Sequence, residues 1–562
     1  MTKFISQILL SFVVFAFCTN LQAQITITDS DINAGETVNW TKDNEYLLDG
    51  FVFVEDGATL NIEAGTIIKG KAAPSTGDLT SALVIAMGGK INATGTADEP
   101  IIFTAESDNG ALSYDDRGLW GGLLLLGRAT IARDVETDQI EGIPASETRA
   151  RYGGTDDSDN SGTLEYVSIR HGGAALTDGN EINGLTLGGV GNGTTIHHIE
   201  VFSNLDDGIE WFGGTVDCKY LAVSYCGDDC MDYDYGWRGK GQHWFALIGA
   251  DKGDNAGEHD GAKPDSETPF SKPTIYNATY IGSGQDGDAK NSTCLHFRDA
   301  AGGTYANSIF VGFKNHAIEV EDLGATQGLD SRQRMEDGDL VLKNNIWFDF
   351  GSGTDLDAGD SGIIRVTTDE DDSNTIVAED PTAQFLIDHL SNNANSLEDP
   401  QLGGISREDD GGLDPRPNED SPVYTNEKAT ASDSFFDETD HIGAFGSTLW
   451  LNGWTALSEG GYLGELATDI ASVEENGIRL EECYPNPTNN TTNINFTLPT
   501  HTAISLKVYD ITGKELAQLL QNQKYPQGTH SLNIDCSAWQ AGLYFYTLKA
   551  GNTTLTQKLL IK

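Results

Sequence analysis

Two acidic segments of the 562-residue chain repeat at a constant spacing. Residues 199–211 read IEVFSNLDDGIEW and residues 221–233 read LAVSYCGDDCMDY, so the second copy follows the first by 22 residues. Stacked copies would bring matching carboxylates within about 5 Å of one another. Like charges at that distance must be protonated, paired or bridged by a cation. The matching acidic residues are Asp206, Asp207 and Glu210 in the first copy and Asp228, Asp229 and Asp232 in the second.

Three kinds of chemistry suit these carboxylates. They can form a hydrogen-bonded turn ladder that caps backbone amides in each repeat. All six can instead be ligands of calcium, which takes about six to eight oxygen atoms. They can also be catalytic. In a hydrolase, Asp207 and Asp229 would act as acid and base, or as a base and a group that positions the water. In a calcium-dependent lyase, a basic residue would remove the proton beside a uronate carboxylate. The basic candidates are Arg170, His171, Arg238 and Lys240.

Two arrangements would separate an enzyme from a binding protein. An enzyme should hold Arg170, Arg238 or Lys240 within hydrogen-bond reach of the aspartates in an open groove. An adhesin should show stacked aromatic rings or rows of Asn and Thr, without a basic residue beside the carboxylates. A group of aromatic residues fits either a sugar-stacking platform or packing between repeats. These residues are Trp211, Tyr225, Tyr233, Tyr235 and Trp237.

The residues around the carboxylates form short alternating strands. Each repeat contains two such strands separated by a polar turn, and further copies occur at residues 167–173 and 308–320. One repeat cannot close a core, so repeats must stack about 4.8 Å apart into long parallel sheets. Helical repeats would need a period of about 3.6 residues, and propeller blades about 40 or more residues per unit. The spacing therefore predicts an all-β fold, a parallel β-helix.

Three long polar stretches interrupt the repeats. They cover residues 134–160, 251–272 and 369–422, and we expect them to be loops on one face of the solenoid. The second stretch contains Glu258, His259 and Asp260, which we interpret as part of a solvated loop, with metal binding as the alternative.

The charge of the chain limits its partners. Lys and Arg number 34 against 86 Asp and Glu, which gives a net charge of −52. Nucleic acids and anionic membrane surfaces bind through clustered Lys and Arg, so this balance argues against both. It favours cations as partners. The 65 Gly and only 4 Met also suit a turn-rich β protein better than a helical one.

The first 23 residues have the features of a signal peptide. Lys3 precedes an apolar run over residues 5–17, and Ala23 ends a cleavage-site pattern. The mature chain is expected to start near Gln24, to be exported, and to contain no membrane-spanning segment. Its six cysteines are too few for a disulfide framework.

The last part of the chain, residues 480–562, carries four spaced motifs. They are YPNPT at 484–488, an ISLKVYDITGK segment at 504–514, GLYFY at 542–546 and a terminal KLLIK. This ordered set resembles the type A C-terminal sorting domain of the Bacteroidota type IX secretion system. The resemblance implies an immunoglobulin-like β-sandwich, recognition by the type IX machinery, and surface anchoring or release. The motif residues are Pro485, Asn486, Pro487, Gly513, Gly542, Tyr544, Lys558 and Lys562.

The predicted β-helix domain covers residues 24–462, ahead of a linker at 463–479. Within it, residues from about 46 to 454 resemble secreted right-handed parallel β-helix proteins of the pectate-lyase-like superfamily. The resemblance rests on the Asp-Asp repeats, the RGKGQ segment at 238–242 and the IGAF segment at 442–445. This fold hosts lyases, hydrolases, esterases and adhesins, so it does not by itself assign a function. We expect a non-enzymatic protein that reaches the cell surface or medium through the periplasm and contacts glycans or other surfaces, with calcium as its cofactor. The alternative is a polysaccharide lyase or glycoside hydrolase that uses the stacked aspartates.

Overall fold

The chain divides into two compact units, residues 1–463 and 464–562. The computed structural model describes residues 23–175, 181–287, 293–324, 329–359, 361–368 and 378–463 of the first unit. In the second unit it describes residues 464, 472–475, 477–481, 483, 488, 491–510, 514–537, 539–540, 542–551 and 553–561. The predicted signal peptide lies outside the described residues, apart from Ala23. Among the described helices, none has the length and apolar character needed to cross a membrane.

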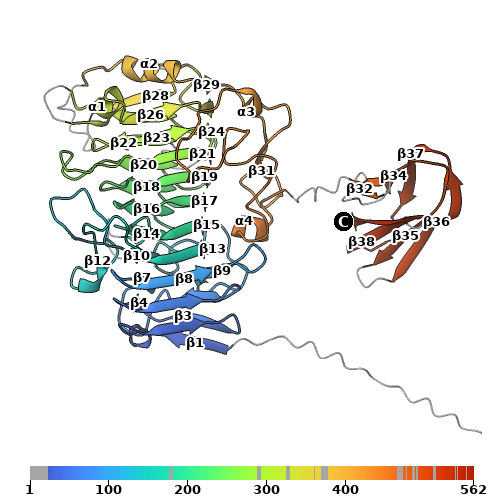
Figure 1. Cartoon of the computed structure of the whole chain (residues 1–562), viewed down its shortest axis with the longest axis horizontal. Coiled ribbons are helices and arrows are strands. Elements are labelled where there is room, and N and C mark those ends of the chain that lie inside the picture. The colour runs from blue at the N-terminus through green and yellow to red at the C-terminus, as the bar shows by residue number, and fades with distance from the viewer. Residues whose placement is uncertain are drawn as a thin grey trace, which may run out of the picture. The chain divides into compact units, whose positions relative to one another are not determined.

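The first unit is a solenoid of parallel strands (Figure 1). One sheet has ten strands, one from each coil in the order of the chain. Its strands are β4 (Phe51–Val54), β7 (Ala82–Ile85), β10 (Leu123–Leu126), β14 (Leu185–Gly188), β16 (Ile209–Phe212), β18 (Met231–Asp234), β20 (Gly257–Asp260), β22 (Leu295–Arg298), β25 (Ile318–Glu321) and β28 (Ile364–Thr367).

A second sheet of seventeen strands forms the rest of the solenoid wall. Its strands are β1 (Ala23–Ile27), β2 (Thr37–Trp40), β3 (Asn44–Leu48), β5 (Thr59–Ile62), β6 (Ile67–Gly70), β8 (Lys90–Thr94), β9 (Ile101–Ala105), β13 (Gly162–Arg170), β15 (Thr195–Phe202), β17 (Cys218–Ser224), β19 (Lys240–Leu247), β21 (Thr274–Ile281), β23 (Gly303–Ala306), β24 (Ile309–Phe313), β26 (Leu340–Lys343), β27 (Ile346–Phe350) and β29 (Ser396–Leu397).

Several short elements are attached to the two large sheets. They are two strand pairs, four helices and two 3₁₀ turns: β11 (Asp138–Gln139) with β12 (Arg151–Tyr152), β30 (Leu402–Ile405) with β31 (Leu413–Pro417), α1 (Ser331–Glu336), α2 (Gln384–Asn392), α3 (Pro422–Thr425), α4 (Ala456–Glu459), η1 (Asp29–Asp31) and η2 (Thr148–Ala150). Leu386 and Leu390 of α2 join the main core.

The strand register confirms the repeat read from the sequence. Ile199 of β15 pairs with Leu221 of β17, and Glu210 of β16 pairs with Asp232 of β18, both at the 22-residue offset. Because side chains alternate along a strand, Ile209 and Trp211 point into the core while Glu210 between them points outward. The predicted β-helix architecture is therefore confirmed.

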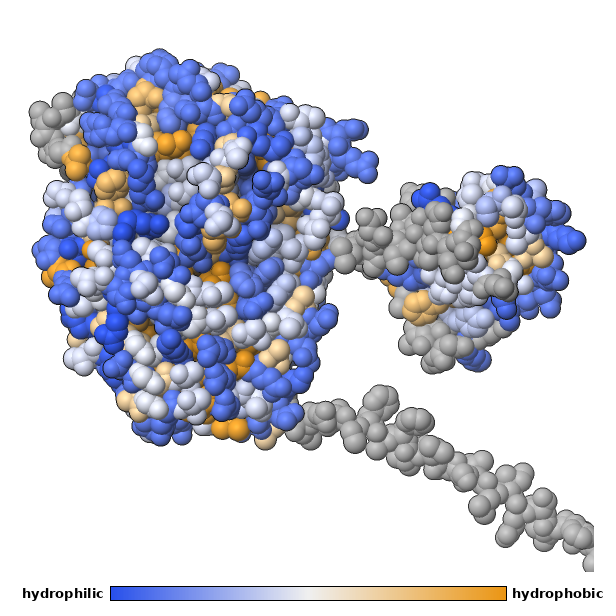
Figure 2. Space-filling model, in the orientation of Figure 1, coloured by the Kyte–Doolittle hydropathy of each residue, from blue (hydrophilic) through white to orange (hydrophobic). Residues whose placement is uncertain are grey.

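Aromatic side chains fill much of the interior. The fully buried Trp211 ring stacks on Trp237 at 4.7 Å and on Trp244 at 5.1 Å between ring centroids. Tyr233 stacks on His259 at 4.0 Å, and both are also fully buried. Trp211, Trp237 and Tyr233 thus pack coil against coil. Figure 2 shows that the visible face of this unit is mainly hydrophilic, with small apolar patches.

The three long polar stretches were wrongly predicted to be only loops. The first contains β11 and β12, and the third contains α2, β29, β30 and β31. The second contributes a strand to the solenoid wall. Residues 257–260 form β20, which pairs with β18 and β22 inside the ten-stranded sheet. Gly257 and His259 face inward, and Glu258 and Asp260 face outward, so the strand alternates as its neighbours do. The alternation is hidden in the sequence because its inward residues are a glycine and a histidine rather than aliphatic side chains.

The segment after β31 returns along the outside of the solenoid and ends in α4. The fully buried Glu200 of β15 holds this helix: its carboxylate accepts hydrogen bonds from the backbone amides of Ala456, at 2.7 Å, and Leu457, at 3.3 Å. The Ser168 hydroxyl donates a third bond, at 2.5 Å. Burial raises the pKa of Glu200, and these hydrogen bonds oppose that shift.

Replacing Glu200 should detach α4. In Glu200→Ala, two amides of the helix and one buried hydroxyl lose their acceptor, so the free energy of unfolding should fall by about 1–3 kcal/mol. Urea denaturation measures the change. The matched control is Glu165→Ala on β13, because Glu165 is half-buried and its one ion-pair partner among the described residues is His197, at 3.6 Å. Equal stability of the two variants would contradict this role for Glu200.

The second unit consists of two antiparallel sheets that share one apolar core. One sheet contains β32 (Ser472–Glu475), β33 (Ile478–Glu481), β34 (Thr491–Leu498) and β37 (Gly528–Asp535); the other contains β35 (Thr502–Asp510), β36 (Glu515–Tyr525), β38 (Gly542–Ala550) and β39 (Thr553–Ile561). Of the sorting-motif residues, Gly542 begins β38, Tyr544 is buried in that strand, and Lys558 lies in β39. Pro485, Asn486, Pro487, Gly513 and Lys562 lie outside the described residues.

Candidate divalent-cation site

The acidic residues of the two repeats lie where each coil enters the ten-stranded sheet. Asp207 comes two residues before β16 and Asp229 two residues before β18. Glu210 and Asp232 are paired within these strands and project from the outer face. We call the six residues of these two coils the carboxylate column: Asp206, Asp207, Glu210, Asp228, Asp229 and Asp232.

Part of the carboxylate column is a turn ladder. Asp207 Oδ1 accepts a hydrogen bond from the backbone amide of Asp229, at 2.9 Å. Asp229 Oδ1 in turn accepts one from the backbone amide of Asn255 in the next coil. Asp207 and Asp229 therefore each cap an amide of the following coil, as the structural interpretation of these turns expects. Each also keeps a second carboxylate oxygen that these two bonds do not use.

Carboxylate oxygens of the column converge in two groups. In one group, an oxygen from each of Asp206, Asp207 and Asp228 lies within 4.8 Å of the others. In the second, Asp207, Glu210 and Asp232 meet the same limit. Asp207 belongs to both groups. One carboxylate thus links two sets of oxygens that are close enough to share a cation.

Buried polar atoms beside the second group lack partners. Asn183, at the turn of the preceding coil, is 1 % exposed and donates its Nδ2 to Glu210 Oε2. Its Oδ1 atom and the Oδ1 atom of Asp232 are buried and make no hydrogen bond with any described residue. A buried acceptor without a donor is costly. Carboxylate and amide oxygens are also the ligands that hard cations such as calcium take.

The electrostatics of the carboxylate column are unfavourable without a cation. Burial, and then repulsion from neighbouring carboxylates, raises the pKa of Asp206 to about 8. The same causes hold the pKa values of Asp207, Glu210 and Asp232 well above their usual range. Burial also raises the pKa of Glu141, in the loop between β11 and β12, to about 7; Asn183 and Glu210 lie beside it.

Comparison with known protein families identifies the family of the solenoid. Residues 31–383 match the model described as a pectate-lyase like beta helix domain. The chain belongs to this family. Residues 482–562 match the secretion system C-terminal sorting domain, so the type IX machinery handles this β-helix and exports it to the cell surface or medium. No curated protein matches the chain closely enough to count as a relative.

Further along the same sheet, the pectate-lyase-like β-helix pairs three of its outward carboxylates with its own basic residues. Arg298 of β22 bonds to Glu258 at 2.9 Å and to Asp260 at 2.6 Å. Arg365 of β28 lies 3.5 Å from Glu319. By contrast, Asp207, Glu210 and Asp232 form no ion pair with any residue that the structure describes. Among the described residues, these three carboxylates therefore have no basic partner of the kind that Glu258, Asp260 and Glu319 have.

The basic candidates from the sequence lie beside other partners. Arg170 bonds to the Ser168 hydroxyl and to Glu459, each at 2.7 Å. Arg238 pairs with Asp157 at 3.3 Å. Lys240 pairs with Asp217 at 3.3 Å and with Asp433 at 3.1 Å, and His171 Nδ1 lies 2.7 Å from the Asp116 carbonyl oxygen. The structure thus brings the acidic candidates together and gives the basic ones acceptors away from the carboxylate column.

Two residues of the site were missed in the sequence. Asn183 occupies the same turn position as Asp207, one coil earlier, and could have been found by extending the repeat upstream. Glu141 comes from an insertion with no repeat spacing, so no sequence signal places it beside Glu210.

Proposed function

We propose that this exported β-helix is a binding protein, without catalytic activity, that holds calcium in the carboxylate column and contacts glycans or other surfaces. The observation that carries the proposal is the group of Asp207, Glu210 and Asp232 oxygens beside the unpartnered Oδ1 of Asn183. The positive charge of a bound cation would offset the repulsion among these carboxylates.

The donor set favours calcium over other metals. Both oxygen groups consist of carboxylates, and an amide oxygen lies beside one of them. Hard oxygen ligands suit calcium and magnesium, whereas zinc and copper prefer sites with His or Cys. Calcium accepts irregular geometry and more ligands than magnesium, which fits oxygens supplied by two successive coils.

Two features support binding rather than catalysis. Arg170, Arg238 and Lys240 have ion-pair partners away from the carboxylate column. An exposed amide row also crosses the seventeen-stranded sheet: Asn61 donates to Asn39, and Asn92 donates to Asn61, each at 2.9 Å. Such a row of regularly spaced amides suits contact with a repeating polar surface such as a glycan.

Calcium titration of the mature chain by calorimetry tests the proposal. Glu210→Gln and Asp232→Asn remove one ligand charge each without changing side-chain size, and each should weaken calcium binding by at least about tenfold. Asp234→Asn is the matched control: Asp234 is a buried carboxylate on the same strand but outside both oxygen groups. It should change the affinity by no more than about threefold.

Two results would refute the cation site, and a third would support an enzymatic function. No calcium heat from the wild-type chain, or unchanged affinity in both ligand variants, would refute the cation site. Release of unsaturated or reducing ends from acidic polysaccharides would instead support the alternative, a polysaccharide lyase or glycoside hydrolase.

A further inference from the structure

A second binding feature lies on the other sheet of the solenoid, where a corner made of amide side chains holds a returning segment. Asn277, Asn307 and Asn344 stand at the same corner of successive coils, each with a left-handed backbone (φ of 56°, 53° and 55°). This conformation suits Asn better than most residues. Residues 427–441, which we call the strap, run along this corner.

The amide side chains form hydrogen bonds with the strap backbone near both of its ends. Asn344 donates to the Glu427 carbonyl oxygen at 3.0 Å. Asn307 exchanges two hydrogen bonds with the backbone of Ala429, at 2.8 and 2.9 Å. At the other end, Gln242 exchanges two with the backbone of Asp437, also at 2.8 and 2.9 Å. Residues 430–436 of the strap connect these two sets of hydrogen bonds.

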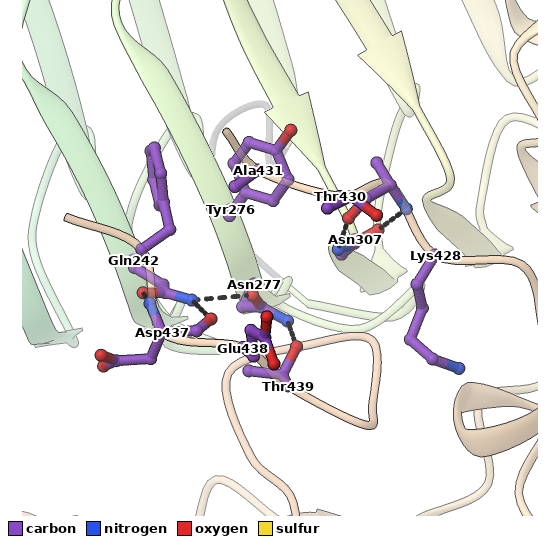
Figure 3. A pocket seen from close by; sticks show the side chains of 12 residues that line it. Gln242, Tyr276, Asn277, Asn307, Lys428, Thr430, Ala431, Asp437, Glu438 and Thr439 are labelled. Carbon is purple, nitrogen blue, oxygen red and sulfur yellow. Dashed lines mark hydrogen bonds between the residues drawn. The ribbon is translucent and has the colours of Figure 1, made fainter. Parts of the chain in front are cut away.

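A pocket of about 210 Å³ lies between this part of the strap and the strands (Figure 3). At about 30 Å³ per water molecule, it has room for about seven waters, or one small ring with its substituents. Tyr276 of β21 and Phe436 of the strap line it as an aromatic pair, with ring centroids 4.8 Å apart. Figure 3 shows Gln242 and Asp437 at one end of the pocket and Lys428 at the other.

Some polar groups in the lining have no partner among the residues that the structure describes. Glu438 and Thr430 make no side-chain hydrogen bond or ion pair with any residue that the structure describes. Asn277, beside Glu438, is already engaged with Thr439 and the His441 carbonyl oxygen. The Lys428 ammonium group is held by the carbonyl oxygens of Tyr424 and Asn426. The pocket therefore offers an acceptor, a hydroxyl and aromatic surface to a ligand.

This chemistry disfavours an anionic ligand and suits a hydroxylated one. Asp437 and Glu438 line the pocket of a chain with a net charge of −52, so an anion would be repelled. A sugar ring has one apolar face for aromatic contact and adjacent hydroxyls that donate to a carboxylate. We infer that the pocket binds a single neutral sugar unit, with Glu438 accepting its hydroxyl hydrogen bonds and Tyr276 and Phe436 contacting the ring. This inference rests on the proposed glycan contact and gives it a location.

Saturation-transfer NMR on the mature chain tests the site, with glucose, galactose, mannose and N-acetylglucosamine as probes in the millimolar range. At least one sugar should receive saturation. Glu438→Ala and Phe436→Ala should each weaken its binding by at least about tenfold. Glu427→Ala is the matched control, because Glu427 is an exposed strap glutamate outside the pocket lining, and it should bind as the wild type does.

The same measurements distinguish sugar binding in this pocket from calcium binding in the carboxylate column. Sugar binding should persist in chelator and in Asp232→Asn, because Asp232 belongs to the ten-stranded sheet and not to the pocket. Absence of transfer to all four sugars, or transfer that Glu438→Ala and Phe436→Ala leave unchanged, would overturn the inference even if calcium binding is intact. Loss of calcium binding with sugar binding retained would refute only the cation site.

Discussion

In chelator, the β-helix is expected to lose thermal stability as the pH rises from about 4 to about 8. The folded chain raises the pKa of Asp206 from 3.8 to about 8, and it holds those of Asp207, Glu210 and Asp232 well above their usual range. A group whose pKa is raised by folding favours the folded state below its unfolded pKa. That contribution is lost as the pH passes through the folded pKa. Melting temperatures measured at several pH values would show the decline.

Calcium should remove most of this dependence. A cation that binds only the folded, ionised column stabilises it in proportion to the logarithm of its concentration, so the gain should be largest at pH 8. Glu210→Gln and Asp232→Asn should melt higher than the wild type in chelator at pH 8, because each removes a repelling charge. Asp56→Asn, which alters a carboxylate with 76 % of its side chain exposed, should follow the wild type. Melting in chelator that is constant or rises over this pH range would contradict the proposed ionisation of the column.

Trp211→Ala should be among the most destabilising single substitutions in the solenoid. Trp211 is fully buried between coils, and its ring stacks on both Trp237 and Trp244. Replacing a buried Trp by Ala costs about 3–5 kcal/mol, because the transfer free energy is lost and a cavity remains. In a stack of coils each repeat contacts only its neighbours. The substitution therefore weakens the packing of this coil against both the preceding and the following coil.

Guanidinium denaturation followed by circular dichroism measures this effect. Trp450→Ala is the control: Trp450 is half-buried on the outside of the solenoid and stacks on Phe445 at 5.2 Å, so its loss should cost less than half as much. A change below about 1 kcal/mol in Trp211→Ala would mean that the interior stack contributes little to stability.

The sequence alone determined the solenoid and the acidic half of the candidate site. A parallel stack keeps equivalent residues one above another, so a constant 22-residue spacing is enough to predict that Glu210 pairs with Asp232. The C-terminal motifs likewise predicted the sorting domain, since four motifs in order are specific. Both results depend on local, periodic patterns.

Only the tertiary structure decided what surrounds those carboxylates. Glu141 reaches the column from an insertion, Arg170 meets Glu459 across 289 positions of the chain, and Lys240 meets Asp433 from the strap. These contacts join segments that share no repeat spacing, so nothing in the sequence pattern encodes their proximity. The amide corner and its pocket have the same origin, because the strap returns over coils formed 83 to 195 residues earlier. Periodicity predicts neighbours within the stack, whereas the positions of insertions and returning segments are set by long-range packing.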